Sequence, residues 1–332
     1  MSIGVTYADV TLFGTIDQAY SKTETSNNTG TLTSTTTIAG VQNGDSGIGF
    51  KGSEDLGNGM KASFLHELGV STQGAAATSV RQAYVALGGA FGQVRIGKQY
   101  SQAFNNTVTV DPMGATGVYG HNSYGVLLSG GSTSAGDEPL RQTNGLQYTL
   151  PAFVEGLGLT VTKTFSGTNT VGAAASDGVG LAVNFSSGAL YAGYTWDRTD
   201  NTGISVAGTP LTAITATATK DRVLETLSAS YDLGMAKIGI NNAKASVDAN
   251  NSLDNTALTV GIPVGSAVIG LSTSSGNQKR LGISTNITGY QIGLDYMLSK
   301  RTVAYAQMGT SKFDTTDKNK LSSSAFGIRH SF

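Results

Sequence analysis

Three short glycine-containing motifs match sequences that serve phosphate binding or catalysis in other proteins. Residues 47–52 spell G-x-G-x-x-G, residues 92–98 spell G-x-x-x-x-G-K, and residues 44–47 read Gly-Asp-Ser-Gly. A phosphate-binding loop needs a helix N-terminus behind its glycines, but the first two stretches are typical of β-strands. Gln99 also stands where a phosphate loop requires Ser or Thr to hold magnesium. With 45 glycines in 332 residues, such matches arise readily by chance.

The Gly-Asp-Ser-Gly segment would need a general base nearby to act as a hydrolase nucleophile. The chain has three histidines, His66, His121 and His330, and no two lie at a metal-ligand spacing such as H-E-x-x-H. His66 and His330 fall on the apolar side of alternating segments, and His121 lies in an expected loop. Cysteine is absent, which excludes thiolate catalysis and Cys-based zinc sites. We therefore expect no enzyme, no cofactor and no metal site.

The composition is poor in charge for a globular domain. Charged residues make up 13% of the chain, against roughly 25% in an average soluble domain. The 21 Lys and Arg balance 22 Asp and Glu, so no basic surface for nucleic acid is expected. A transmembrane helix needs about 20 consecutive apolar residues, and the best candidate, 257–271, is interrupted by Pro263 and three glycines. Because no linker divides residues 1–332, we expect one domain.

Apolar residues alternate with small or polar residues through much of the chain. At 179–186, Val, Leu, Val and Phe alternate with Gly, Ala, Asn and Ser. This period of two predicts strands with one apolar face. The other face suits water, so the apolar face must meet a hydrophobic partner outside the sheet, as in a transmembrane β-barrel with a wet lumen. The same alternation recurs at 146–150, 157–161, 258–262, 292–298 and 326–332.

Short and long connections alternate between these segments, which is typical of outer-membrane barrels with short periplasmic turns and long outer loops. We therefore predict an all-β fold, a transmembrane antiparallel β-barrel of about 16 strands; an even number brings both termini to one side. Short turns are expected near 53–59, 186–188, 232–234, 263–265 and 299–301, and long polar connections at 21–45, 166–177, 199–220 and 314–321. The predicted strands begin near residues 10, 46, 59, 79, 92, 143, 157, 178, 188, 222, 235, 254, 265, 288, 301 and 323.

Residues 1–8 precede the first predicted strand. They lack the charged start and apolar core of a complete signal peptide. Thr6-Tyr7-Ala8 could be the tail of a signal cleavage site, and residues 1–8 could equally be a plain extension. Both interpretations stay open.

Five motifs are spread along the chain: FKGSEDLGNGMKA at 50–62, RQAYV at 81–85, FGQVRIG at 91–97, LSKRT at 298–302 and GIRHSF at 327–332. They resemble, in the same order, motifs of the Gram-negative general porins, especially the betaproteobacterial branch. The resemblance spans nearly the whole chain and implies a 16-stranded barrel in the outer membrane, usually a homotrimer, through which small hydrophilic solutes diffuse. Its surroundings would be outer-membrane lipid and lipopolysaccharide.

The resemblance assigns a role to the C-terminal residues. In this family a terminal Phe and the alternating residues before it form the signal that the barrel-assembly machinery reads. Phe332 occupies the terminal position here, and Phe326, Ile328 and His330 occupy the alternating positions.

The resemblance also implies that the loop after the fifth strand, here 101–125, folds inward and narrows the pore. Asp111 is the only carboxylate of this segment. Arg81 and Arg141 match basic wall residues of the family by position, and Lys51 lies nearby with lumen parity. Gly47 stands where close relatives often carry another arginine, so we predict a weakly anion-selective channel. The same charges could instead form an ion-pair network on the wall.

The alternation supports the two arginines unequally. Arg141 shares its face with Gln147 and Thr149, which places it in the lumen. The strand that contains Arg81 is ambiguous, because turning Tyr84 toward lipid would leave Val85 in the lumen.

Two other functions are compatible with parts of this pattern. A substrate-specific channel would line its path with stacking aromatics or a dense ladder of charges, and the inward positions indicate neither. A secreted adhesin or autotransporter passenger would show a repeat of fixed period, which the sequence lacks.

Overall fold

The computed structural model describes residues 9–40, 46–70, 72, 79–113, 140–166, 177–200, 220–280 and 282–332. The expectations for residues 1–8, for His121 and for the 114–125 part of the predicted constriction loop lie outside these ranges. Within them, no helix combines the length and the apolarity of a membrane-spanning helix.

Nearly all of the described chain is β-strand, with one helix between β6 and β7. The strands are β1 (Asp9–Asn27), β2 (Gly30–Ala39), β3 (Ser46–Gly57), β4 (Met60–Val70), β5 (Ser79–Gly89), β6 (Gly92–Tyr100), β7 (Arg141–Thr149), β8 (Leu157–Thr164), β9 (Gly178–Ser187), β10 (Leu190–Thr199), β11 (Arg222–Asp232), β12 (Lys237–Asp248), β13 (Asn251–Val264), β14 (Ala267–Arg280), β15 (Ile283–Met297), β16 (Thr302–Phe313) and β17 (Lys320–Ser331), and the helix is α1 (Gln102–Val110).

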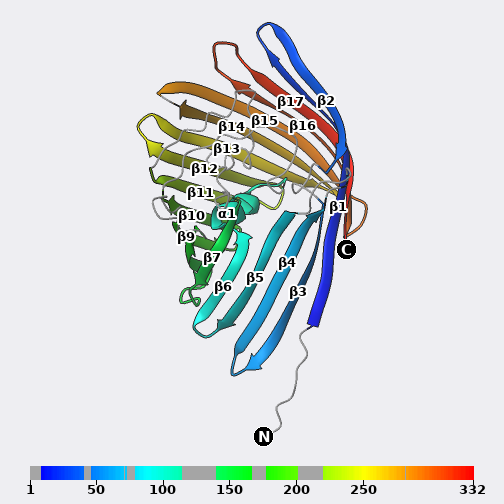
Figure 1. Ribbon diagram of the computed structural model, residues 1–332. Helices are drawn as coiled ribbons and strands as arrows, with labels where there is room; N and C mark the ends of the chain where they lie inside the picture. The colour runs from blue at the N-terminus through cyan, green and yellow to red at the C-terminus, as the bar shows by residue number, and fades with distance from the viewer. Residues whose placement is uncertain are drawn as a thin grey trace.

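These strands form a single antiparallel sheet that closes on itself as a barrel (Figure 1). Neighbours in sequence pair with each other except β2 and β3, and β1 pairs with β17 to close the ring. The first half of β1 pairs with β3 and its second half with β2, so β2 and β3 share one position in the ring. The 17 segments of the described residues therefore make 16 barrel strands. The predicted all-β, 16-stranded barrel is confirmed.

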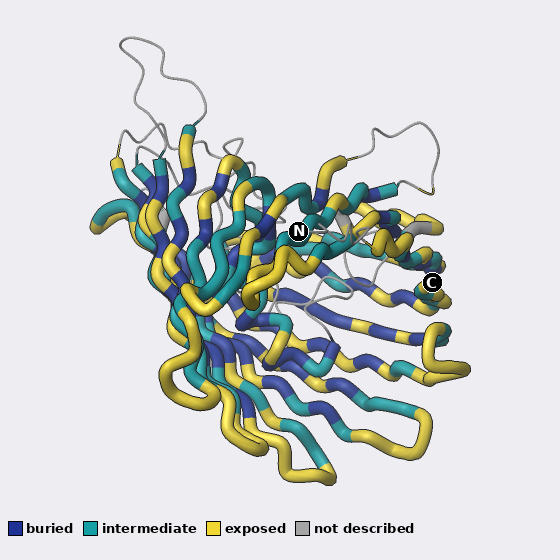
Figure 2. The backbone as a smooth tube through the Cα atoms, turned by 90° about the horizontal axis from the view of Figure 1, so that it is seen from below, coloured by how far each residue is buried: buried dark blue, intermediate teal, exposed yellow. Residues whose placement is uncertain are grey.

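The two faces of the barrel wall differ in the way that the alternation predicts. On β15, Tyr290, Ile292 and Leu294 are exposed on the outer face, whereas Gln291 between them is 2% exposed and faces inward. Exposed and buried residues alternate in this way along most strands (Figure 2). An apolar exterior around a polar interior is the arrangement of a barrel that sits in lipid and holds water.

The two ends of the barrel differ in their connections. At one end, which we call the turn end, every connection is short, from residues 58–59 to residues 298–301. The longest connections join strands at the opposite end, which we call the loop end; they are 71–78, 101–140, 165–177 and 200–221.

The expected loop over residues 21–45 is wrong for most of its length. β1 continues to Asn27 and β2 returns from Gly30 to Ala39, and the two pair as a tall hairpin. Their Thr- and Ser-rich sequence lacks an apolar face, because this hairpin extends toward the loop end instead of crossing the apolar band. The period-two signal depends on contact with lipid and disappears where that contact ends.

Candidate pore constriction and its wall

α1 begins and ends with clear local signals. Ser101 is the N-cap, and its side-chain oxygen accepts a hydrogen bond of 3.0 Å from the backbone N–H of Phe104. Asp111 has extended dihedral angles, and the following Pro112 cannot continue a helix. The helix therefore occupies one short, defined stretch of the segment predicted to constrict the pore.

The helix lies inside the barrel, against the inner faces of β9 to β12 (Figure 1). The Tyr191 hydroxyl on β10 donates a 2.7 Å hydrogen bond to Oδ1 of Asn106. The Thr259 hydroxyl on β13 donates a 2.8 Å bond to the carbonyl of Val110 at the C-terminal end of the helix. Side chains of the wall thus hold both the middle and the end of α1.

Arg81 is the extra residue of a β-bulge in β5. Glu67 of β4 pairs with Gln82 and Leu68 with Val80, so Arg81 has no residue directly opposite. A bulge turns two successive side chains to the same face. Both meet one carboxylate: Nε of Arg81 lies 2.8 Å from Oε1 of Glu67, and Nε2 of Gln82 donates to Oε2 at 3.0 Å.

The bulge also resolves the ambiguous parity of this strand. Val85 and Leu87 are exposed on the outer face. The Tyr84 ring points inward, where the guanidinium of Arg95 lies 4.4 Å from its centroid. Placing Tyr84 toward lipid, the option that made Arg81 uncertain, is therefore wrong.

Tyr100 joins the two arginines that the sequence singled out. Its hydroxyl accepts a 3.0 Å hydrogen bond from Nη2 of Arg81, and the Arg141 guanidinium lies 5.1 Å from its ring centroid. The same ring contacts Phe104 of α1, with centroids 4.6 Å apart. The half-buried Tyr100 thus brings Arg81 and Arg141 together where the chain leaves the wall and enters α1.

An extra residue in β7 interrupts the alternation between Arg141 and Gln147. Gly97 pairs with Gly145 and Gln99 with Gln142, so β7 carries one more residue than β6 between these pairs. Asn144 absorbs the extra residue with a φ of 49°. The contact of Arg141 with Tyr100 now supports the assignment that parity alone could not.

The other two predicted residues belong to other elements, Lys51 to β3 and Asp111 to the C-terminal end of α1. Lys51 pairs with Thr11 of β1, and its Nζ lies 5.3 Å from the ring centroid of the inward-facing Phe13. Asp111 is 6% exposed, and its Oδ1 accepts a 2.9 Å bond from the backbone N–H of Met113. The structure thus joins Arg81 with Arg141 through Tyr100, while Lys51 contacts Phe13 and Asp111 contacts Met113.

Three residues of this region were missed from the sequence: Glu67, Arg95 and Tyr100. Arg95 could have been found, because it stands in a clean alternation with the outward Val94 and Ile96. Glu67 and Tyr100 carry no comparable signal. Glu67 meets Arg81 because of the bulge in β5, and Tyr100 meets Phe104 because α1 begins directly after β6.

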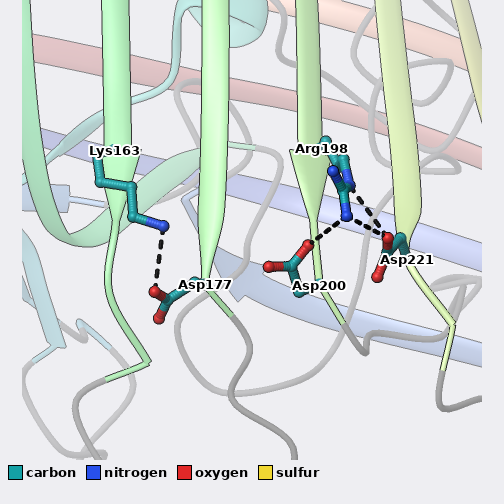
Figure 3. A network of polar contacts seen from close by, with 5 residues as sticks. All are labelled: Lys163, Asp177, Arg198, Asp200 and Asp221. Carbon is teal, nitrogen blue, oxygen red and sulfur yellow. Dashed lines mark hydrogen bonds and ion pairs between the residues drawn. The ribbon is translucent and has the colours of Figure 1, made fainter.

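Charged side chains also gather on the outer face, near the loop end of β8 to β11 (Figure 3). Lys163 and Arg198 both pair across strands with the outward Val179. Nζ of Lys163 lies 3.1 Å from Asp177, and Arg198 forms ion pairs with Asp200 and Asp221. A hydrogen bond from the Ser166 backbone, followed by the Lys163 ammonium, holds the pKa of the Asp177 carboxyl below its usual value.

The C-terminal residue completes the closing ladder. Phe332 exchanges two backbone hydrogen bonds with Gly14 of β1, of 3.0 and 3.1 Å. Its ring covers Gly14: a Cβ there would lie 2.4 Å from Cζ of Phe332. Phe326 and Ile328 are exposed on the same outer face, and the His330 ring nitrogen Nδ1 lies 2.9 Å from the Thr302 hydroxyl.

A closed barrel with an apolar exterior, a polar interior and a helix folded against its inner wall defines a transmembrane channel of the outer-membrane type. A family model for the Gram-negative porins matches residues 3–316, so the chain belongs to that family. The protein is an outer-membrane channel and not an enzyme, as the sequence predicted.

Individual relatives agree with this assignment. Outer membrane porin protein 32 of Delftia acidovorans is 29% identical over 293 residues, which cover 85% of this chain and 78% of that protein. Major outer membrane protein P.IB of Neisseria meningitidis (strain Z2491) is 26% identical over 336 residues, 98% of this chain and 94% of that protein.

Solved structures show the same fold. The anion-selective porin from Comamonas acidovorans has a TM-score of 0.81 at 24% identity, covering 98% of this chain and all of that one. OmpT of Vibrio cholerae, solved in a trimer form, has a TM-score of 0.72 at 15% identity, covering 98% of this chain and all of that one.

Proposed function

We propose that this porin is a passive diffusion pore for small hydrophilic solutes and ions, with a weak preference for anions. The observation that carries the proposal is the convergence of Arg81 and Arg141 on Tyr100, at the foot of the helix that enters the lumen. Positive charge is thereby concentrated where the predicted constriction loop, 101–125, begins.

The local charge count favours anions only slightly. We define the constriction set by the predicted Lys51, Arg81, Arg141 and Asp111 together with Arg95 and Glu67. It contains four cations and two carboxylates, a formal excess of two positive charges. An ion about 5 Å from one uncompensated charge gains about 0.8 kcal/mol at the dielectric constant of water. Salt at 0.15 M screens over about 8 Å, so the bias in permeability should be only a few-fold.

The similar Comamonas acidovorans protein is described as anion-selective, which agrees with the proposed sign. The Glu67 carboxylate beside Arg81 and the glycine at position 47 both lower the positive charge of this wall. We therefore place this pore at the weak end of anion preference.

The zero-current potential across a potassium chloride gradient tests the proposal. Wild type should show a potential of the anion-selective sign. The double variant Arg81→Ser and Arg141→Ser should lose most of that potential, because two cations leave the constriction set.

A matched control removes the same number of cations elsewhere. Lys163→Ser with Arg198→Ser takes two positive charges from the outer face (Figure 3) and should leave the potential unchanged. A clearly cation-selective wild type would refute the proposed selectivity. If the Arg81 and Arg141 variant kept the wild-type potential and conductance, these residues would not line the narrowest part of the pore.

A further inference from the structure

Four glycines lie on the inner wall where residues 110–113 cross it. Gly261 of β13 pairs with Gly270 of β14, and Gly270 pairs with Gly293 of β15, so three glycines form a straight row across three strands. Gly239 of β12 lies beside the row, paired with Thr259. We call Gly239, Gly261, Gly270 and Gly293 the glycine trench.

The backbone of Val110 and the ring of Pro112, both rigid, lie over Gly239 and Gly261 of the trench. A Cβ on Gly239 would lie 2.4 Å from the carbonyl oxygen of Val110, and one on Gly261 would lie 2.5 Å from Cβ of Pro112. Non-bonded carbon atoms need about 3.5–4.0 Å. Neither a backbone carbonyl nor a proline ring can rotate away, so an alanine at either glycine would displace the segment itself.

Met113 fills the other half of the trench. A Cβ on Gly270 would lie 2.2 Å from its Sδ, and one on Gly293 would lie 2.1 Å from its Cε. Met113 is 7% exposed, and its backbone N–H is held by the Asp111 carboxylate at 2.9 Å. The segment therefore ends in a side chain whose backbone is held by Asp111 and whose Sδ and Cε occupy the space above Gly270 and Gly293.

The neighbouring row of the same strands shows that the absence of side chains is local. Two residues along each of β13, β14 and β15 from the glycines lies a row formed by Thr259, Ser272 and Gln291. These residues carry polar side chains that point inward. Pro112 and Met113 lie over the glycines, whereas Val110 next to them accepts a hydrogen bond from Thr259 of the neighbouring row. The trench is thus matched in position to its occupant.

We propose that the glycine trench determines the width of the pore, because its depth fixes how far residues 110–113 stand from the wall and hence how far they reach into the lumen. This inference rests on the proposed diffusion function. One methyl group in the trench should push Pro112 or Met113 inward by about 1–2 Å, the difference between the distances above and normal contact. The narrowed pore would pass less current and exclude smaller solutes.

The first test uses Gly261→Ala, where the rigid Pro112 cannot yield. We expect lower single-channel conductance than wild type and a smaller size limit for sugars in liposome swelling. Gly88→Ala is the matched control: it adds the same methyl group to a β5 wall glycine, where the nearest atoms lie 3.8 Å away. This control should conduct like wild type.

The second test is compensatory and applies even if Gly261→Ala does not fold. Gly270→Ala should reduce conductance, and adding Met113→Ala to it should restore conductance, because the shorter side chain vacates the space that the methyl group takes. Folding is checked for each variant by heat-modifiable electrophoretic migration.

Two failures can be told apart. If wild type conducts but every folded trench variant conducts equally, the trench does not set the width and the inference is overturned. If wild type forms no open channel, the diffusion function itself fails. In that case a crystal structure of a trench variant still decides the inference, since residues 110–113 must have moved inward.

Discussion

The ion pair with Glu67 lowers the net charge that Arg81 contributes to the pore wall. The two side chains are 10% and 15% exposed, and their charged atoms lie 2.8 Å apart. Arg81 also donates to Tyr100. Its charge is therefore partly compensated on the wall, while its position is fixed by two partners.

Glu67→Gln should strengthen the preference for anions. The amide has the size of the carboxylate and keeps an acceptor for Arg81, but it removes one negative charge from the constriction set. We expect the zero-current potential in a potassium chloride gradient to shift further in the anion-selective direction, by an amount that corresponds to a few-fold change in permeability ratio at most. Glu155→Gln, in the exposed turn between β7 and β8, is the control. An unchanged potential in Glu67→Gln would mean that ions do not sense this pair.

At the scale of single residues, the sequence identified candidate site residues better than it identified the residues that contact them. Arg81, Arg141, Lys51 and Asp111 could be chosen by resemblance, and their lumen role remains a prediction. Glu67 could not be chosen, because the bulge that brings it to Arg81 leaves no trace in the alternation.

Among the elements, strands that cross the apolar band were predictable and those beyond it were not. β6, β8, β9 and β11 begin at the residues expected from the alternation. β15 begins at Ile283, five residues before its expected start at 288, because its first outward residues, such as Ser284 and Asn286, are polar. The β1–β2 hairpin was missed for the same reason.

The helix α1 was also missed. Its sequence, QAFNNTVTV, is rich in Asn and β-branched residues, which have modest helix propensity. The wall of β9 to β13 supplies the hydrogen bonds and packing that favour the helix here. No local pattern could report contacts with strands so distant in sequence.

Deleting Phe332 should strongly reduce the amount of folded barrel in the outer membrane. The deletion removes both backbone hydrogen bonds to Gly14 and the ring that covers it, in addition to the proposed assembly signal of Phe326, Ile328, His330 and Phe332. Folded protein is measured as the heat-modifiable fraction in outer-membrane preparations. Deletion of Gly208, in the long connection between β10 and β11, should cost little. Equal yields from the two deletions would contradict the proposed role of the C-terminus.

The outer surface of the whole molecule is apolar in one region and carries ion pairs in another. The strands near the ring closure carry Val10, Leu12, Phe50 and Val85 outward, among the exposed apolar residues, while β8 to β11 carry ion pairs near the loop end. The homotrimer that the resemblance to the general porins implies remains a prediction for this chain.

The purified protein should therefore be rich in β-structure by circular dichroism and migrate in cold detergent electrophoresis as an oligomer of three chains. Boiling should convert it to a monomer band near 34.0 kDa. Chemical cross-linking before electrophoresis provides the independent count of chains. A predominantly helical spectrum would contradict the fold, and a ladder that stops at the monomer would contradict the trimer alone.

The seam between β1 and β17 joins the two ends of the chain. The hydroxyls of Thr15 and Ser331 lie 3.1 Å apart across 316 residues of sequence. Contacts between residues so far apart in sequence are slow to form. Until they form, strands with unpaired edges are prone to aggregate. Until the last dozen residues have been exported, β1 lacks its final partner and the sheet has two open edges. A newly secreted chain must therefore be kept apart from other copies for as long as its own C-terminus takes to arrive.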